Sequence, residues 1–279
     1  MNYFNRLWTP ASLRLIAATS IVINGFFPAV WILLTSLKQE TELVQKPITY
    51  WPVNLTLQNY VQAFTDQPLL KYLGNSLVVA GLATVASLLV SALAAYPIAR
   101  LQLRHRQLIL TAIVASSMFP MVTLLVPLFE IMRALNLLNT YTALVLPYMV
   151  MNLPVCTLVL VSFFQSIPKD LENAAMLDGC TRIGTLWRVI VPLSAPGVFT
   201  AGILAFVNSW DEFLLALSLN SSASMRTVPV GIALYQGEFS FPWPIISAAL
   251  IVAIVPIAVL IAVFQDRVVG GLTQGGLKG

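Results

Sequence analysis

The chain has 279 residues, of which 58 % are hydrophobic and only 9 % are charged, and its formal net charge is +4. Soluble globular domains carry about 45–50 % apolar and about 25 % charged residues, so 15 basic and 11 acidic side chains cannot cover a water-facing surface of this size. The composition excludes a soluble enzyme, a disordered chain and a secreted disulfide scaffold, and it predicts an integral membrane protein.

Six continuous apolar runs are long enough to be membrane helices, because a hydrocarbon core of about 30 Å needs about 20 mostly apolar residues. They cover residues 13–34, 73–97, 108–131, 141–164, 195–219 and 245–264. A lipid-facing β-barrel would show short alternating segments instead, so we expect an all-α integral membrane fold with six transmembrane helices over 13–264. The first run is longer than a signal-peptide core and lacks a small-residue cleavage site after it, so we interpret it as an uncleaved span.

Lys and Arg gather in the segments on one side of the six runs, among them Arg100, Arg104 and Arg106. Because basic residues are enriched in cytoplasmic loops, we expect residues 1–12, the loop over 165–194 and the tail over 265–279 in the cytoplasm. The loops over 35–72 and 220–244 would then face the exterior.

Two features inside the runs predict close helix packing and bending. Small residues stand at every fourth position of the second run, at Ala83, Ser87, Ser91 and Ala95, and such stripes allow another helix to approach closely. Prolines lie inside the third, fourth and sixth runs, and their lost backbone hydrogen bonds are tolerated where neighbouring helices or water replace them. These prolines either kink spans around a cavity or only shape the bundle; the sequence leaves both readings open.

Charge is nearly absent from the interior of the runs, where only Asp211 and Glu212 occur. A charge within a membrane is expected to face protein or water, so this pair either lies at a translocation path or its outer gate, or is paired structurally. Cys156 and Cys180 are too few for a metal site or a disulfide framework. The chain has no P-loop phosphate-binding motif and no ladder of intramembrane acids and histidines, so uphill transport would need energy from a partner.

The loop over 165–194 is predicted to form two short helices. Pro168 suits a first helical turn, Asp170 and Glu172 complement the positive helix end, and Gly179 suits a C-terminal stop, which together predict a helix over 168–178. A second helix is expected over 181–191. Helices of this length are marginal alone, so the first needs a docking surface, either on another protein or on its own bundle.

The loop also carries a motif. Ala174-Ala175-x-x-Asp178-Gly179, followed by Val191-Pro192-Leu193, resembles the "EAA" loop of binding-protein-dependent ABC importer permeases, and more specifically of the smaller permease subunit of carbohydrate importers of the maltose/trehalose type. The resemblance extends over most of the chain, through Phe119-Pro120, Leu137 to Thr140, Leu146-Pro147-Tyr148, Trp210-x-Glu212-Phe213, Thr227 to Gly231 and the glycine-rich tail from Gly270 to Gly279.

The resemblance implies a type I ABC importer permease fold whose cytoplasmic coupling helix docks into an ATPase. The coupling residues it implies are Leu171, Glu172, Asn173, Ala174, Ala175, Leu177, Asp178, Gly179, Arg182 and Trp187. Asn173 stands where the family has the glutamate that names the loop, and we expect Glu172 to take over its contact. The family also implies that the tail enters the interface between the two ATPases, through Gly271, Leu272, Thr273, Gly275, Gly276 and Lys278; composition alone would favour a disordered terminus.

By the same resemblance, the chain is half of the translocation pathway of an ATP-driven sugar importer in a bacterial inner membrane. The substrate class would be a disaccharide or small glucoside such as maltose, trehalose or glucosylglycerol. The expected partners are a second, homologous permease that pairs through small-residue faces, two ATPases that bind ATP and Mg²⁺, and an extracytoplasmic sugar-binding protein. Candidate substrate-facing residues are Asn152, Asn208, Trp210 and Asp211. The alternative is a self-contained secondary transporter or channel; no catalytic residue, cofactor or metal site is expected in this chain.

Overall fold

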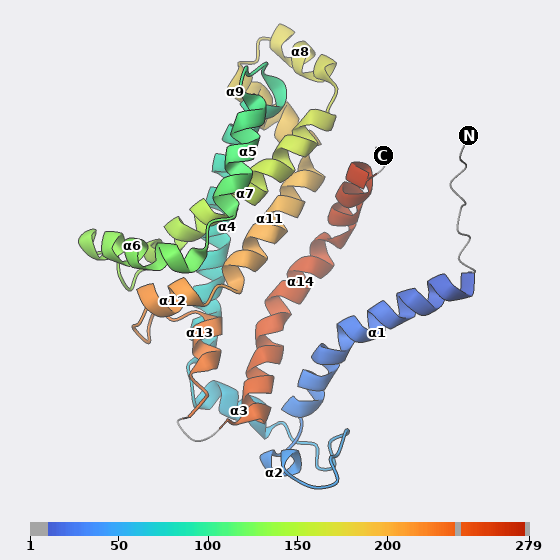
Figure 1. The fold of residues 1–279 in the computed structure, drawn as a ribbon, viewed down its shortest axis with the longest axis vertical. Helices are drawn as coiled ribbons and strands as arrows, with labels where there is room; N and C mark the ends of the chain where they lie inside the picture. The colour runs from blue at the N-terminus through green and yellow to red at the C-terminus, as the bar shows by residue number, and fades with distance from the viewer. Residues whose placement is uncertain (1–10, 238–240, 277–279) are drawn as a thin grey trace. The chain divides into compact units, whose positions relative to one another are not determined.

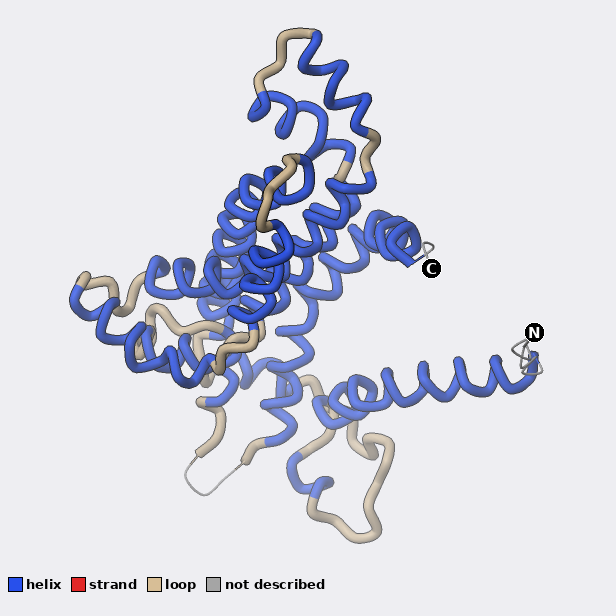
Figure 2. Tube along the Cα trace, turned by 45° about the horizontal axis from the view of Figure 1, so that its top comes forward, coloured by secondary structure: helices blue, strands red, loops and turns tan. Residues whose placement is uncertain are grey.

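The computed structural model describes residues 11–237 and 241–276, with side chains over 15–237 and 241–265. Every regular element in these ranges is a helix, which confirms the predicted all-α class (Figures 1 and 2). The elements are α1 (Ala11–Ser36), α2 (Glu40–Leu43), α3 (Gln58–Thr65), α4 (Leu69–Arg100), α5 (Arg106–Ser117), α6 (Met121–Ala134), α7 (Tyr141–Ser166), α8 (Lys169–Leu177), α9 (Arg182–Thr185), the π-helical turn η1 (Leu186–Ile190), α10 (Val191–Leu193), α11 (Ala195–Trp210), α12 (Leu214–Leu219), α13 (Val228–Ala233) and α14 (Trp243–Gly276).

The chain divides into two compact units. One unit comprises residues 1–67 and 235–252 and therefore contains α1, α2, α3 and the beginning of α14. The other comprises residues 68–234 and 253–279 and contains α4 to α13 and the rest of α14. Each unit is described by itself below.

Four helices of the described chain are long and apolar enough to cross a membrane: Leu15–Ser36, Leu69–Arg100, Tyr141–Ser166 and Trp243–Gln265. Two further candidates are pairs of helices joined at a sharp bend, so the number of spans rises to six if each bent pair is one span. Four of the six predicted runs thus coincide with continuous helices, and the third and fifth do not.

The third run, 108–131, is broken. Helix α5 ends at Ser117, α6 begins at Met121, and the two are bent by 86°. Proline lacks a backbone N–H and disfavours helical geometry in the residue before it, so a helix tends to end before a proline. Pro120 lies in the break between the two helices and has an extended conformation. The third run therefore consists of two helices at a sharp bend, which agrees with the expected effect of its prolines on helix direction.

The fifth run, 195–219, is interrupted as well. Helix α11 ends at Trp210, and α12 begins only at Leu214. At its other end α11 is bent by 83° from the helical segment Arg182–Leu193, and Pro196 lies in its first turn. The helix therefore stops well before residue 219, and Asp211 and Glu212 lie in the break rather than within a continuous helix.

The core of the larger unit lies where α4 packs against α7 and α11. The small-residue stripe of α4 is fully buried there: Ser87 Oγ donates to Ala83 O over 2.6 Å and also lies 3.3 Å from Met149 O of α7, and Ser91 Oγ donates to Leu153 O over 3.5 Å. The stripe thus serves close packing against α7 of the same chain. The expected close approach of another helix is therefore made by α7, and none of the four stripe residues is exposed.

Candidate functional site

Helix α8 is the short helix predicted over 168–178, and it lies beyond the ends of α4 and α7 (Figure 1). Its C-terminal stop has the predicted chemistry: Gly179 has φ +89°, in the left-handed region that favours glycine. The backbone N–H of Gly179 donates to Met176 O, and that of Cys180 donates to Ala175 O. This turn reverses the chain into α9.

The two faces of α8 differ in burial. Glu172 and Ala175, one turn apart, are buried against the chain's own helices. The opposite face carries Asn173, Ala174 and Leu177, all exposed, with Leu177 at 89 %. An exposed apolar face on a helix of nine residues is a surface suited to a partner.

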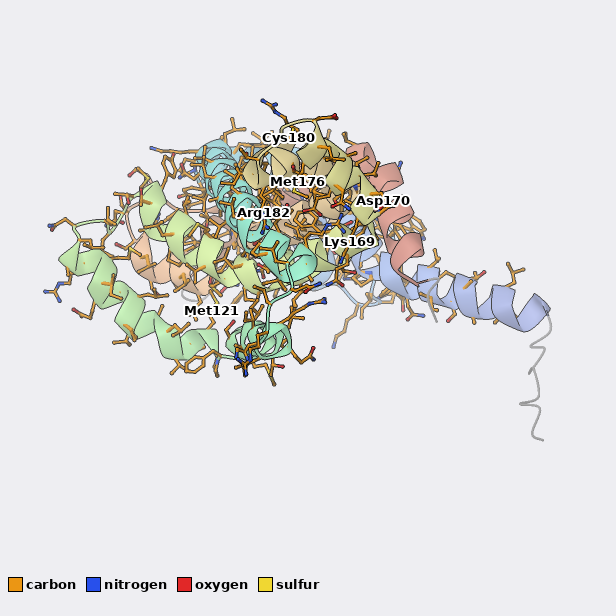
Figure 3. All side chains as sticks on the ribbon, turned by 90° about the horizontal axis from the view of Figure 1, so that it is seen from above. Met121, Lys169, Asp170, Met176, Cys180 and Arg182 are labelled. Atoms are coloured by element: carbon orange, nitrogen blue, oxygen red, sulfur yellow. The ribbon has the colours of Figure 1, made fainter. Side chains whose placement is uncertain are left out.

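The helical segment after Gly179 is anchored more deeply. Thr181 caps α9 by accepting the backbone N–H of Gly184 over 3.1 Å. Leu186 and Ile190 of η1 enter the core formed by α4, α7 and α11. Figure 3 looks onto this hairpin, with Lys169 and Asp170 at the start of α8 and Cys180 and Arg182 in the segment that follows it. Arg182 is exposed, and Trp187 keeps 37 % of its surface open.

Glu172 does not face outward. Its Oε2 forms an ion pair with Arg100 Nε at 2.8 Å, and its Oε1 accepts a hydrogen bond from Tyr96 Oη. Both carboxylate oxygens are therefore engaged with the end of α4. The exposed residue of the motif is Asn173, so the expectation that Glu172 supplies the missing outward acid has no support in this geometry.

Arg100 and Tyr96 were not candidates from the sequence. They lie 72 and 76 residues before Glu172 in the chain, and the sequence presents Arg100 only as one of several basic residues in the expected cytoplasmic segments. The position of Arg100 in the sequence did indicate a possible contact, because a basic residue at the very end of an apolar run can bind groups at the end of a neighbouring helix. Only the packing of α4 against α7 brings it to the loop.

The four candidate substrate-facing residues separate into two pairs. Asn152 is buried: its Nδ2 donates to Ser209 Oγ over 2.9 Å, and its Oδ1 accepts from Asn208 Nδ2 over 2.8 Å. Trp210 is also buried, and its ring stacks on Phe206 at 5.6 Å between centroids. Asn208 and Asp211, three residues apart, are exposed. The structure thus leaves only the second pair on a surface.

Glu212 has a structural role at the break after α11. Its Oε2 accepts a hydrogen bond from Tyr148 Oη over 2.5 Å, and its carboxylate also accepts the backbone N–H groups of Leu215 and Ala216 over 2.9 and 3.1 Å. The side chain therefore caps α12 and joins it to α7. Of the two readings for the Asp211–Glu212 pair, structural pairing holds for Glu212.

The expected tail residues fall at the edge of what the structure describes. The backbone of Gly271, Leu272, Thr273, Gly275 and Gly276 is helical, as the end of α14, while Lys278 lies outside the described residues.

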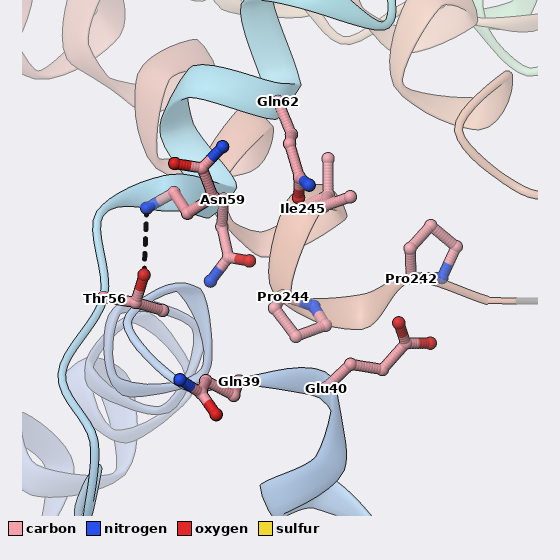
Figure 4. Close-up of a pocket in the computed structure, with 9 residues that line it drawn as sticks. Gln39, Glu40, Thr56, Asn59, Gln62, Pro242, Pro244 and Ile245 are labelled. Atoms are coloured by element: carbon pink, nitrogen blue, oxygen red, sulfur yellow. Dashed lines mark hydrogen bonds between the residues drawn. The ribbon is translucent and has the colours of Figure 1, made fainter.

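A pocket of about 280 Å³ lies in the smaller unit (Figure 4). Its lining comes from both loops expected at the exterior: Gln39, Glu40, Thr56, Gln58, Asn59 and Gln62 from one, and Pro242, Pro244 and Ile245 from around the start of α14. Asn59 Nδ2 donates to Ser36 O and Lys38 O over 2.8 Å each, and so ties α3 to the end of α1. Tyr235 Oη donates to Ala63 O, which ties the two loops together. Among the described residues there is no cluster of His, Cys, Asp and Glu that could hold a metal ion.

These features define a class: an all-helical, multi-pass membrane protein with broken helices and a short two-helix hairpin that presents an apolar face. Residues 87–274 match the family of binding-protein-dependent transport system inner membrane components, and the chain belongs to this family. The family is one of transport subunits, not of enzymes.

Among its relatives, the sulfoquinovosyl glycerol transport system permease protein of Agrobacterium fabrum is 70 % identical over 267 residues, 96 % of this chain and 94 % of that protein. The trehalose/maltose transport system permease protein of Thermococcus litoralis is 38 % identical over 270 residues, 96 % of each chain. A solved chain of a bacterial ABC transporter involved in the import of the acidic polysaccharide alginate has the same fold, with a TM-score of 0.76 at 19 % identity over 95 % of this chain and 99 % of that one.

Proposed function

We propose that the chain is one of two permease subunits of an ATP-driven importer for a small glycoside in the bacterial inner membrane. The observation that carries the proposal is the exposed outer face of α8, together with the near full-length similarity to a sulfoquinovosyl glycerol permease. The chain itself performs no covalent chemistry. ATP and Mg²⁺ act on two partner ATPases, and the chain couples their closure to the opening and closing of its spans.

The substrate class follows from the relatives. The 70 % identical protein is named for a sulfonated glycoside of glycerol, and a more distant one for trehalose and maltose. A glycosyl glycerol fits the expected substrate size, a disaccharide or small glucoside, and it agrees with the name of the 70 % identical relative. Sulfoquinovosyl glycerol is therefore the first compound to test. The exposed amide and carboxylate of Asn208 and Asp211 are suited to sugar hydroxyl groups.

The topology proposed is six spans, with each bent helix pair counted as one span, and with residues 1–12, 165–194 and 265–279 in the cytoplasm. This arrangement puts α8 on the ATPase side and the pocket of the smaller unit on the exterior side. We assign that pocket and the loops around it to contact with an extracytoplasmic binding protein. A second, homologous permease completes the pathway.

Coupling is tested on the complete importer, with tagged permease co-expressed with its ATPase and receptor. Leu177→Asp buries a charge in the apolar contact and should abolish co-purification of the ATPase. The matched control is Leu55→Asp, because Leu55 is also an exposed leucine but lies in the smaller unit. Equal ATPase recovery with both variants would contradict docking through α8.

Transport is tested in proteoliposomes with ATP inside and loaded receptor outside. Uptake of sulfoquinovosyl glycerol that requires ATP and receptor supports the proposal. Uptake of maltose or trehalose instead would overturn the substrate assignment and leave the assignment as an ATP-driven importer intact. Uptake by the permease without any ATPase would support the alternative, a self-contained transporter or channel.

The tail is proposed to enter the ATPase interface. Deletion of residues 270–279 should leave the ATPase bound through α8 but lower receptor-stimulated hydrolysis. Wild-type coupled uptake by the truncated protein would refute this role.

A further inference from the structure

One buried cluster ties the proposed coupling helix to a membrane helix. Arg100 is the last residue of α4, and Glu172 lies in the first turn of α8. Their side chains keep only 2 % and 11 % of their surface exposed and form an ion pair at 2.8 Å. Tyr96, one turn before Arg100, donates its hydroxyl to the other carboxylate oxygen. Glu172 is therefore joined to two successive turns of α4.

The same guanidinium also holds the turn that precedes α8. Arg100 Nη1 donates to Ile167 O over 2.8 Å, and Nη2 donates to Pro168 O over 3.4 Å. These two carbonyls belong to the non-helical connection between α7 and α8, where Ile167 is extended and Pro168 has φ −57° and ψ 136°. Without the bonds from Arg100, this two-residue connection is where we expect α8 to turn relative to α7. One arginine thus joins the end of α4, the end of α7 and the start of α8.

The chemistry of the cluster favours a rigid connection. A buried ion pair contributes little net stability compared with apolar residues of the same volume, because both charges lose water, but losing one partner is strongly destabilising. Planar guanidinium geometry adds directional bonds to carbonyl and carboxylate oxygens. The buried, directional pair between α4 and α8 is therefore better explained by its positioning of α8 relative to α4 than by its contribution to stability alone.

We propose that Arg100, Glu172 and Tyr96 form a joint that makes α8 and the cytoplasmic end of α4 move as one body. The joint rests on the proposed function, because it transmits to α4 the displacement that the ATPase imposes on the outer face of α8. Without the joint, α8 would pivot at Ile167 and Pro168 and the displacement would be absorbed there. These three are positioning residues; they contact neither nucleotide nor substrate.

The test is the number of substrate molecules imported per ATP hydrolysed, measured in proteoliposomes with the complete importer. Glu172→Gln keeps the shape and the acceptor for Tyr96 but removes the charge that faces Arg100. We expect the ATPase to co-purify as with wild type, and the import ratio to fall about ten-fold, within the usual range of coupling between sites. Tyr96→Phe, which removes one hydroxyl, should give a smaller loss in the same direction.

A double variant separates positioning from folding. Arg100→Met with Glu172→Met removes both buried charges at similar volume, so its thermal stability should return toward wild type, whereas the import ratio should stay low because methionines make no directional bond. The matched control is Glu130→Gln, which removes the carboxylate of the exposed pair with Arg133 at 3.8 Å and should change nothing.

The outcomes decide between the two proposals. A wild-type import ratio in Glu172→Gln, or a ratio that recovers together with stability in the double variant, would overturn the joint and leave the proposed function intact. Failure of the wild-type permease to recruit any ATPase would overturn the proposed function, and the joint with it.

Discussion

Gly231 on α13 lies directly against the ring of Tyr72 on α4: a Cβ added to Gly231 would come within 2.1 Å of Tyr72 Cδ2. Tyr72 is fully buried and belongs to a cluster with Phe206, Trp210 and Val228. The ring has no flexible end to move aside, so only glycine permits this approach of α13 to α4.

Gly231→Ala should therefore destabilise the protein by about 1–3 kcal/mol, the usual cost of overpacking a core. The measurement is thermal unfolding of the purified permease in detergent. Gly81→Ala is the matched control, since a Cβ at Gly81 meets nothing within 4 Å. A melting temperature of Gly231→Ala equal to that of the control would contradict the contact.

Glu212→Ala should loosen the break between α11 and α12. The substitution removes the acceptor of the Tyr148 hydroxyl and of two backbone N–H groups. Unsatisfied buried donors cost about 1–3 kcal/mol each, so we expect a clearly lower melting temperature. Asp211→Ala, at the neighbouring exposed carboxylate, should leave the melting temperature near wild type; a reversed order of the two variants would exclude the capping role.

Asp211 should affect transport rather than stability, whereas Asn208→Ala should affect both, because the Asn208 amide also donates to the buried Asn152. Asp211→Asn removes a charge from an exposed side chain, and loss of a hydrogen bond of about 1 kcal/mol to a sugar hydroxyl would raise the KM for uptake roughly five-fold. Asn152→Ala and Trp210→Ala, at buried positions, should instead lower thermal stability. The idea of a sugar-facing surface fails if uptake by both Asn208→Ala and Asp211→Asn has wild-type kinetics.

Asn173→Glu should strengthen the proposed contact between α8 and the ATPase. Asn173 is exposed on the outer face of α8, while the carboxylate of Glu172 is engaged within the chain. Restoring the acid that the family has at this position should tighten ATPase binding several-fold, by roughly 1 kcal/mol, as for other charged pairs at an interface rim. Salt titration of the permease–ATPase complex measures this gain; Asn173→Gln, of matched length without charge, is the control and should show none.

Several parts of the fold could be predicted because membranes constrain each segment locally. A span must be apolar over its whole length and must satisfy its backbone within itself, so α1, α4, α7 and α14 were visible as runs. The stop of α8 at Gly179 was predictable for a similar reason, since the left-handed turn depends on one residue type.

The breaks were harder to predict. Pro120 was visible, but whether a proline bends or ends a membrane helix depends on the neighbours that replace its lost hydrogen bond. In the break that follows α11, Glu212 accepts a hydrogen bond from Tyr148, which lies 64 residues earlier in the chain. The local sequence around Glu212 does not indicate that Tyr148 is its partner.

The sequence by itself determined that this is a multi-pass membrane protein, where the loop with the family motif lies and which family it resembles, because scarce charge and a short spaced motif are local properties. Only the tertiary structure decided what each scarce polar group does. It buried Glu172 against Arg100, turned the stripe of α4 toward α7 and left Asn208 and Asp211 on a surface. In an apolar medium a polar side chain must find its partner by proximity in space, and that proximity is set by helix packing rather than by position along the chain.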